Sequence, residues 1–228
     1  IDGETVKKVD VVSGYIHRGI EKLCEDLTYP SLLLYTERMD YMGAHMNRHA
    51  TCLCIEKALG IEVPHRAEVI RMMMDELMRL SSHLLSYGCL TMDQGATTAF
   101  FYGFREREYI YDIFDKTCGA RMSMSYDTIG GVVRDVHPDF VNDVRKACDA
   151  IEKAIPEYHK LFSGNVIALG RMKDVGTLSL EDAKSYAITG PSGRASGFHC
   201  DVRKTHPYSL YNEVEFDEVV YENGDSYD

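Results

Sequence analysis

Two histidines that stand four residues apart, His45 and His49, are the first candidates for chemistry in this sequence. Residues at this spacing lie on one face of a helix, where two imidazoles can share a zinc ion. The zinc-protease pattern also needs a glutamate directly after the first histidine, and Met46 occupies that position. Spacing alone identifies no third ligand. We therefore favour a solvated or subunit-contacting pair of histidines, and we predict that this chain binds no metal.

The glycine-rich segment GPSGRASG, residues 190–197, is a candidate cradle for phosphate groups. It lacks the G-K-[ST] end of a P-loop, and its glycine spacing differs from the dinucleotide fingerprint. We predict a structural loop instead.

The seven cysteines are odd in number and scattered, which indicates neither a disulfide framework nor a metal-ligand set. This usage favours a reducing cytoplasm.

The balance of charge argues against nucleic acid as a partner. The chain carries 36 acidic and 25 basic residues, a formal net charge of -11, whereas phosphate binding needs a basic face. No apolar run approaches the length of a membrane span, and no signal peptide is recognisable. We therefore expect any membrane association to come through partner proteins.

Helical periodicity dominates the chain and defines the elements that must position any site. We predict helices over residues 30–59, 64–90, 99–117 and 139–162, and a short helix from the capping box of Ser179 and Asp182 to near Gly190. Strands are expected over residues 5–9 and 209–220. The predicted fold class is mainly α (α+β), a multi-helix bundle with small peripheral antiparallel strands.

Three segments follow from this pattern. Residues 1–13 are predicted to be a strand or hairpin remnant, residues 14–164 a helical core, and residues 165–228 a mixture of loop, short helix and strand. The opening turn has no strand before it, and the turn near residues 222–225 has no element after it. We therefore expect an internal fragment of a longer protein.

Many short motifs occur in one order along the whole chain. They are YIHRGIEKL (15–23), TYP (28–30), ERMDY (37–41), IEKALG (55–60), PHRAE (64–68), DQGA (93–96), FFY (100–102), RERE (105–108), GAR (119–121), IGGV (129–132), DVRK (201–204) and PY (207–208). In this order they resemble the quinone-site subunit, the D-type subunit, of respiratory complex I, the proton-pumping NADH:quinone oxidoreductase. The relatives of that family are the large subunits of nickel–iron hydrogenases, which implies a hydrogenase large-subunit-like fold.

The resemblance bears on the metal question. In the hydrogenase relatives, the segment after Glu-Arg carries a Cys-x-x-Cys pair that holds nickel and iron, and the corresponding positions here are Asp40 and Gly43. A soft metal requires thiolates, which neither residue supplies. The chain thus resembles the branch that lost the metal and uses the vacated cavity for quinone. Under this interpretation His45 and His49 are bystanders.

The resemblance also implies roles for four residues. Tyr41 matches the tyrosine that donates a hydrogen bond to the quinone head group and can deliver a proton. Asp93 matches the aspartate that pairs with a quinone-contacting histidine, which lies in an H-P-x-x-H-G loop before residue 1. Arg38 and Arg121 match arginines near a [4Fe–4S] cluster that a partner subunit holds.

The implied function is electron transfer from that cluster to quinone, coupled to proton pumping. Expected partners are the other complex I subunits: the one with the terminal iron–sulfur cluster, the neighbouring C-type subunit, and the membrane subunit at the quinone channel. The expected location is the cytoplasmic face of the cell membrane, as a peripheral subunit. Two alternatives are a subunit of a ferredoxin-driven, hydrogenase-related membrane complex and a non-catalytic helical scaffold.

One departure from the family pattern concerns Ser123. Many members place a histidine there, two residues after the arginine of Gly-x-Arg, to couple the redox state of the cluster to a proton. Serine does not titrate near neutral pH. We therefore hypothesise a cluster whose potential responds weakly to pH, and a steep slope in an EPR redox titration of the assembled complex would contradict this.

Overall fold

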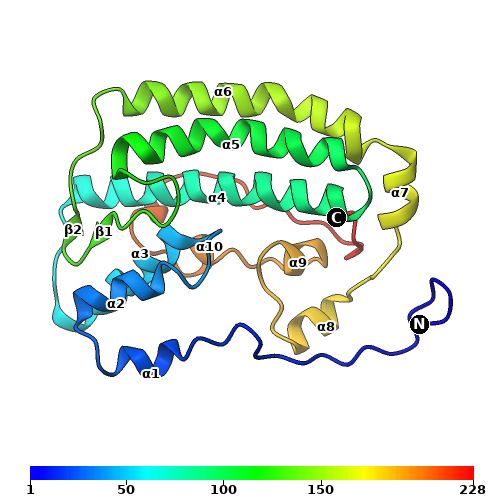
Figure 1. Cartoon of the computed structure of the whole chain (residues 1–228), viewed down its shortest axis with the longest axis horizontal. Coiled ribbons are helices and arrows are strands. Elements are labelled where there is room, and N and C mark those ends of the chain that lie inside the picture. The colour runs from blue at the N-terminus through cyan, green and yellow to red at the C-terminus, as the bar shows by residue number, and fades with distance from the viewer.

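Three long helices lie side by side and form one layer of the molecule (Figure 1). They are α4 (His65–Asp93), α5 (Thr97–Cys118) and α6 (Phe140–Tyr158), each antiparallel to the next. The computed structural model describes residues 1–228. The main apolar core lies between these helices and includes Met74, Phe114 and Ile151.

Sequence and packing explain why α4 and α5 run so close together. The apolar stripe predicted for residues 64–90 is buried along α4, and Pro64 precedes its first turn. Gly103 of α5 faces α4 so closely that a Cβ atom there would lie 2.6 Å from the carbonyl oxygen of Leu84. The two backbones therefore meet at a glycine, and the α4–α5 pair forms a rigid support.

The helix predicted over residues 30–59 is wrong as one element. It is two helices, α2 (Tyr29–Thr36) and α3 (Ala44–Leu59), separated by an irregular segment of residues 37–43. In that segment the backbone N–H of Met42 donates to Oδ1 of Asp40 over 2.8 Å. Such local bonds compete with the helical ladder. The break exposes Tyr41, whereas Arg38 stays bonded to the end of α2, where its Nη1 donates to the carbonyl oxygen of Leu34 over 2.9 Å.

The remaining elements are short and surround the long helices. They are α1 (Ile20–Cys24), β1 (Asp127–Thr128), β2 (Gly131–Val132), the π-helix η1 (His159–Ser163), α7 (Val166–Met172), α8 (Leu180–Ser185), α9 (Gly190–Ala195), α10 (Val202–Thr205) and the 3₁₀-helix η2 (Tyr211–Glu213). Strands β1 and β2 pair in antiparallel fashion, Asp127 opposite Val132 and Thr128 opposite Gly131. The predicted fold class is confirmed, because the chain is mainly helical with one small sheet.

Several local predictions need correction. Residues 190–195 form the helix α9, with Pro191 in its first turn, where a loop was predicted. The strand predicted over residues 209–220 is absent; η2 occupies part of this range and the rest pairs with no strand. At the start of the chain only Asp2 and Thr5 form an isolated bridge. The division into three segments stays a prediction.

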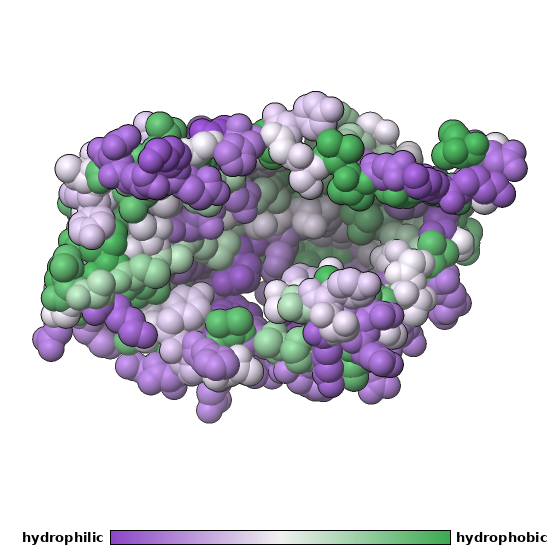
Figure 2. All heavy atoms as spheres, turned by 90° about the horizontal axis from the view of Figure 1, so that it is seen from below, coloured by the Kyte–Doolittle hydropathy of each residue, from purple (hydrophilic) through white to green (hydrophobic).

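The capping box is confirmed, since the Ser179 side chain accepts from the backbone N–H of Asp182 at the start of α8. Helix α8 ends at Ser185, before the predicted stop near Gly190. None of the helices combines the length and the apolar content that crossing a bilayer requires. The face turned downward in Figure 1 is hollowed and largely polar, with apolar side chains in scattered groups (Figure 2).

Candidate functional site

A cavity of about 560 Å³ opens between the segment that precedes α1 and the irregular segment between α2 and α3. Its wall includes both polar and apolar side chains: Tyr15, Ile16, His17, Arg18, Arg38, Met39, Tyr41 and Ser123. A second cavity of about 310 Å³ shares Arg18 and Arg38 with the first and is otherwise lined by Ile20, Leu23, Leu34 and Tyr35. The two arginines therefore stand between a mixed and a mainly apolar compartment.

The structure brings two of the four predicted site residues together. Arg38 and Tyr41 line the same cavity, and Tyr41 is 65% exposed, so its hydroxyl is available to a ligand. Ser123 lies on this wall with a φ of 52°, in the left-handed region. Arg121 is two residues away and pairs with Glu108 of α5 over 2.7 Å.

Asp93 lies elsewhere. It is the last residue of α4, is exposed, and is not part of the cavity wall. Asp75, an α4 residue that contacts α3, precedes Asp93 by about 27 Å along the helix, at 1.5 Å per residue. Within this chain, Asp93 therefore does not share the cavity of Tyr41.

The positions that match the hydrogenase cysteines lie next to each other in space. A Cβ atom built on Gly43 would lie 3.0 Å from Oδ2 of Asp40. The carboxylate of Asp40 thus fills the space that a side chain at position 43 would need. The two positions supply one hard oxygen ligand and no thiolate, so they do not fit a nickel–iron centre.

Buried Glu37 anchors the cavity wall. Its side chain is 1% exposed, and it accepts from Arg38 Nη1 over 2.7 Å, from Arg48 Nη1 over 2.7 Å and from Ser125 Oγ over 2.8 Å. Arg18 Nη2 donates to the carbonyl oxygen of Arg38 over 2.9 Å. Charge-assisted bonds from several directions fix the carboxylate. They hold Arg38 in place although its segment is irregular.

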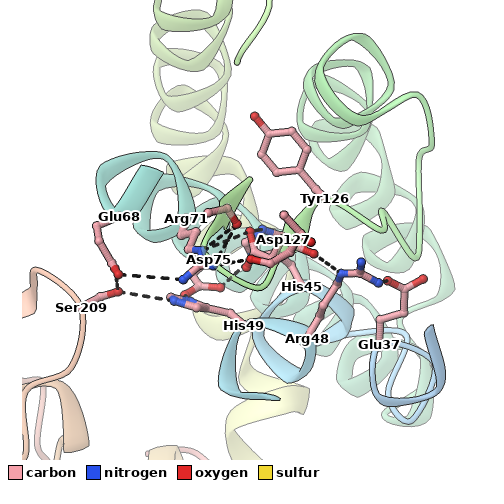
Figure 3. Close-up of polar contacts among 12 residues, drawn as sticks. Glu37, His45, Arg48, His49, Glu68, Arg71, Asp75, Tyr126, Asp127 and Ser209 are labelled. Carbon is pink, nitrogen blue, oxygen red and sulfur yellow. Dashed lines mark hydrogen bonds and ion pairs between the residues drawn. The ribbon is translucent and has the colours of Figure 1, made fainter. Parts of the chain in front are cut away.

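A buried polar cluster lies behind this wall and contains both histidines of the opening motif (Figure 3). The Nδ1 atoms of His45 and His49 lie 2.8 Å and 2.6 Å from the two carboxylate oxygens of Asp75. His45 Nε2 faces Asp127 Oδ1 of β1 over 3.2 Å. The prediction of a solvated or subunit-contacting pair is wrong, because both imidazoles are almost fully buried and bind one aspartate. That the two histidines are bystanders to the quinone chemistry stays a prediction.

The electrostatics of the cluster favour charged groups. Burial would lower the pKa of His45, but Asp127 and Asp75 outweigh it and raise that pKa to about 10. Burial would likewise raise the pKa of Asp75, but hydrogen bonds from His45 and His49 lower it to about 2. His45 is therefore an imidazolium held between two carboxylates.

Arg71, fully buried, ties the cluster to the small sheet. It forms two bonds with Glu56, of 3.0 Å and 2.7 Å, and it donates to the carbonyl oxygens of Thr128 and Gly131. The backbone N–H of Gly130 donates to the same Glu56 over 2.8 Å. Arg71 and Asp75 are one helical turn apart on α4, so a charged pair within an otherwise apolar stripe was the sequence signal for this cluster.

Comparison with known proteins agrees with the resemblance drawn from the motifs. The family model described as "Respiratory-chain NADH dehydrogenase, 49 Kd subunit" matches residues 93–228. This match covers more than half of the chain, which therefore belongs to the family of the 49 kDa subunit of the respiratory-chain NADH dehydrogenase.

Similar curated proteins are named as subunits of NADH-quinone oxidoreductase. The C/D subunit of NADH-quinone oxidoreductase from Bacteroides fragilis is 59% identical over 227 residues, which are 100% of this chain and 43% of that protein. The D subunit of the Bacillus cytotoxicus oxidoreductase is 42% identical over 228 residues, 100% of this chain and 62% of that protein. A second D subunit, from Rhizobium meliloti, is 44% identical over 227 residues, and 56% of its length is covered. The chain thus spans less than two thirds of these relatives.

Proposed function

We propose that this chain forms the quinone-binding part of a proton-pumping NADH:quinone oxidoreductase and passes electrons from a neighbouring subunit's iron–sulfur cluster to quinone. The observation that carries the proposal is the shared cavity of Tyr41 and Arg38. Its volume of about 560 Å³ falls within the usual range for small organic ligands. Family membership and the names of the relatives support the reaction class.

Tyr41 is the proposed hydrogen-bond donor to a quinone carbonyl. A phenol is neutral over the physiological range and can both donate a hydrogen bond and release a proton. Reduction of quinone to quinol takes up two electrons and two protons. Tyr41 would deliver one of these protons to a quinone oxygen and must then be reprotonated from another group.

Arg38 is the proposed cation of the site. Arg38 and Arg48 share the single carboxylate of Glu37, so this group of three side chains carries one net positive charge. A positive charge close to a cluster raises its reduction potential and also stabilises a reduced quinone. Arg121, whose guanidinium pairs with Glu108 and Asp112, is the proposed second arginine near the partner's cluster.

Asp93 is proposed to act through a histidine of the whole protein rather than by direct contact with the cavity. Its exposed position at the end of α4 leaves the carboxylate open to a partner from outside this chain. An aspartate in this role orients the imidazole and stabilises its charged form. We also propose that the chain lies at the cytoplasmic face of the membrane. Its proposed neighbours there are the cluster-bearing subunit, the C-type subunit and the membrane subunit.

The substitution Tyr41→Phe tests the proposal, because it removes only the hydroxyl. In the assembled complex we expect NADH:quinone activity to fall by about 100-fold, within the range that one lost general acid costs. NADH oxidation by ferricyanide, which bypasses the quinone site, should stay unchanged. Tyr35→Phe, in the adjoining cavity, is the matched control and should retain quinone activity. Equal activities of the two variants would contradict the proposal.

A further inference from the structure

The buried cluster contains as many carboxylates as fixed cations that pair with them. Its four carboxylates are those of Glu37, Glu56, Asp75 and Asp127, and all are at most 4% exposed. The permanent or strongly stabilised cations are Arg48, Arg71, His45 and, at the rim, Arg38, which binds Glu37. An uncompensated buried charge is costly, so any further proton in the cluster needs a route by which it can leave. The remaining imidazole inside it is His49.

His49 is also the member with a connection to the surface (Figure 3). Its Nε2 lies 3.4 Å from Oγ of Ser209, and that hydroxyl hydrogen-bonds to Oε2 of Glu68. The side chain of Glu68 is 15% exposed, whereas those of His49 and Asp75 are 1% exposed. The hydrogen-bonded chain thus runs from His45 through Asp75, His49 and Ser209 to a solvent-accessible carboxylate, and an ion pair joins His45 to Asp127.

The hydrogen-bond partners of His49 indicate which of its ring nitrogens can carry a proton. Ionised Asp75 only accepts, so His49 Nδ1 carries a proton. While the Ser209 hydroxyl donates to Glu68, its oxygen can accept from His49 Nε2–H, so these contacts accommodate a proton on each ring nitrogen of His49. Ser209 has a φ of 46°, a backbone conformation that is costly for a residue other than glycine. This strained residue carries the only hydroxyl in the chain of contacts.

We propose that His49 is a proton-exchange site, loaded and unloaded through Ser209 and Glu68. On unloading, the N–H bond at Nε2 breaks and its proton goes to Ser209 Oγ, while the hydroxyl proton of Ser209 goes to Glu68 Oε2. Each transfer breaks one bond and forms one, so a single proton leaves and no electron moves. Glu68 then releases the proton to solvent.

The groups around His49 determine whether a substitution nearby favours or opposes its charged form. Asp75 and Glu68 favour its charged form, whereas Arg71, 3.9 Å from Glu68, and the imidazolium of His45 oppose it. The other groups that face it are Glu56 on its own helix, and Tyr208 and Ser209 from the C-terminal segment. The proposed route for protons does not continue past Asp127 to the cavity. Arginine does not release its proton, so Arg48 and Glu37 connect the cluster to the cavity by charge alone.

Hydrogen–deuterium exchange at the imidazole C2 carbon, followed by mass spectrometry, reports the pKa of individual histidines in a large assembly. Tryptic cleavage after Arg48 separates the two rings, because His45 falls in the peptide of residues 39–48 and His49 in that of residues 49–57. In the assembled complex we expect the His49 exchange rate to vary with pH between pH 5 and 9, because the proposed route lets this imidazole exchange its proton with solvent. The His45 rate should stay flat over this range.

Variants test the route itself. Glu68→Gln should lower the His49 midpoint by about one pH unit, because it removes a nearby negative charge. Ser209→Gly removes the hydroxyl while accepting the positive φ, and should lower the midpoint in the same direction. Glu62→Gln, an equal charge change at an exposed position on the preceding loop, should leave it unchanged. A flat His49 profile, equal effects of Glu68→Gln and Glu62→Gln, or no effect of Ser209→Gly would each overturn the proposal.

Discussion

Arg38 and Tyr41 depend on side chains that never meet the cavity. Arg38 is held by Glu37, and Glu37 is held by Arg48 from α3 and by Ser125 from beyond α5. Arg38 and Tyr41 were predicted as site residues from the motif resemblance alone, since nothing in their spacing indicates a cavity. The partners of Glu37 could not be predicted, because they lie 11 and 88 residues away along the chain. The irregular segment that exposes Tyr41 depends on these same long-range contacts.

The charge state of the histidine cluster predicts how stability depends on pH. The folded pKa of His45, about 10, lies above its ordinary value of 6.5, so its contribution is complete below pH 6.5 and is lost as the pH rises toward 10. The folded pKa of Asp75, about 2, lies below its ordinary value of 3.8, so its contribution is present above pH 3.8 and is lost as the pH falls toward 2.

The substitution His45→Gln should remove the alkaline part of this dependence. At pH 6 we expect the whole protein to lose about 3 kcal/mol of unfolding free energy, because two buried carboxylates lose their cation. Between pH 6.5 and 10 the variant should lose less stability than the wild type. His65→Gln, which removes an exposed imidazole, should change the free energy by less than about 0.5 kcal/mol. Denaturant unfolding at several pH values makes the measurement, and parallel curves for wild type and His45→Gln would contradict the assignment.

At the level of elements, the long helices and the start of α8 could be predicted, whereas most of the short elements could not. Residues 64–90 and 99–117 carry enough apolar repeats to define α4 and α5 to within a few residues. The alternating pattern of residues 209–220 favoured a strand, yet its side chains pack individually, with Tyr211 bonded to Glu76 of α4 and Phe216 beneath Arg203. A strand needs a partner that the local pattern does not supply. Here the tertiary contacts of the individual side chains outweighed the local preference for a strand.

The close approach of α4 and α5 gives a prediction at this scale. Gly103→Ala places a methyl group 2.6 Å from a backbone carbonyl that cannot move aside, and we expect a loss of about 1–3 kcal/mol in unfolding free energy. Gly170→Ala in α7 has nothing within 4 Å of the new Cβ and should gain about 0.5–1 kcal/mol from helix propensity. Thermal unfolding of both variants makes the comparison. Equal melting temperatures would show that the contact between α4 and α5 carries no such constraint.

At the scale of the whole molecule, one layer of long helices supports two distinct polar regions. The cavity lies toward α1 and α2, and the buried histidine cluster lies where α3, α4 and β1 meet. Glu37 and Arg48 connect the two regions by ion pairs. The fold class was predictable from periodicity, and the family from the order of motifs. The cluster was missed because its carboxylates, Asp75 and Asp127, lie 30 and 82 residues after His45.

If the cavity of Arg38 and Tyr41 receives a quinone head group, residues of its wall should react with a bound photoreactive quinone. A photoreactive quinone analogue, bound to the assembled complex, should modify the tryptic peptide of residues 39–48, which contains Met39 and Tyr41 of the cavity wall. Excess unlabelled quinone should abolish that modification. Competable labelling confined to other peptides, with residues 39–48 unmodified, would contradict the account.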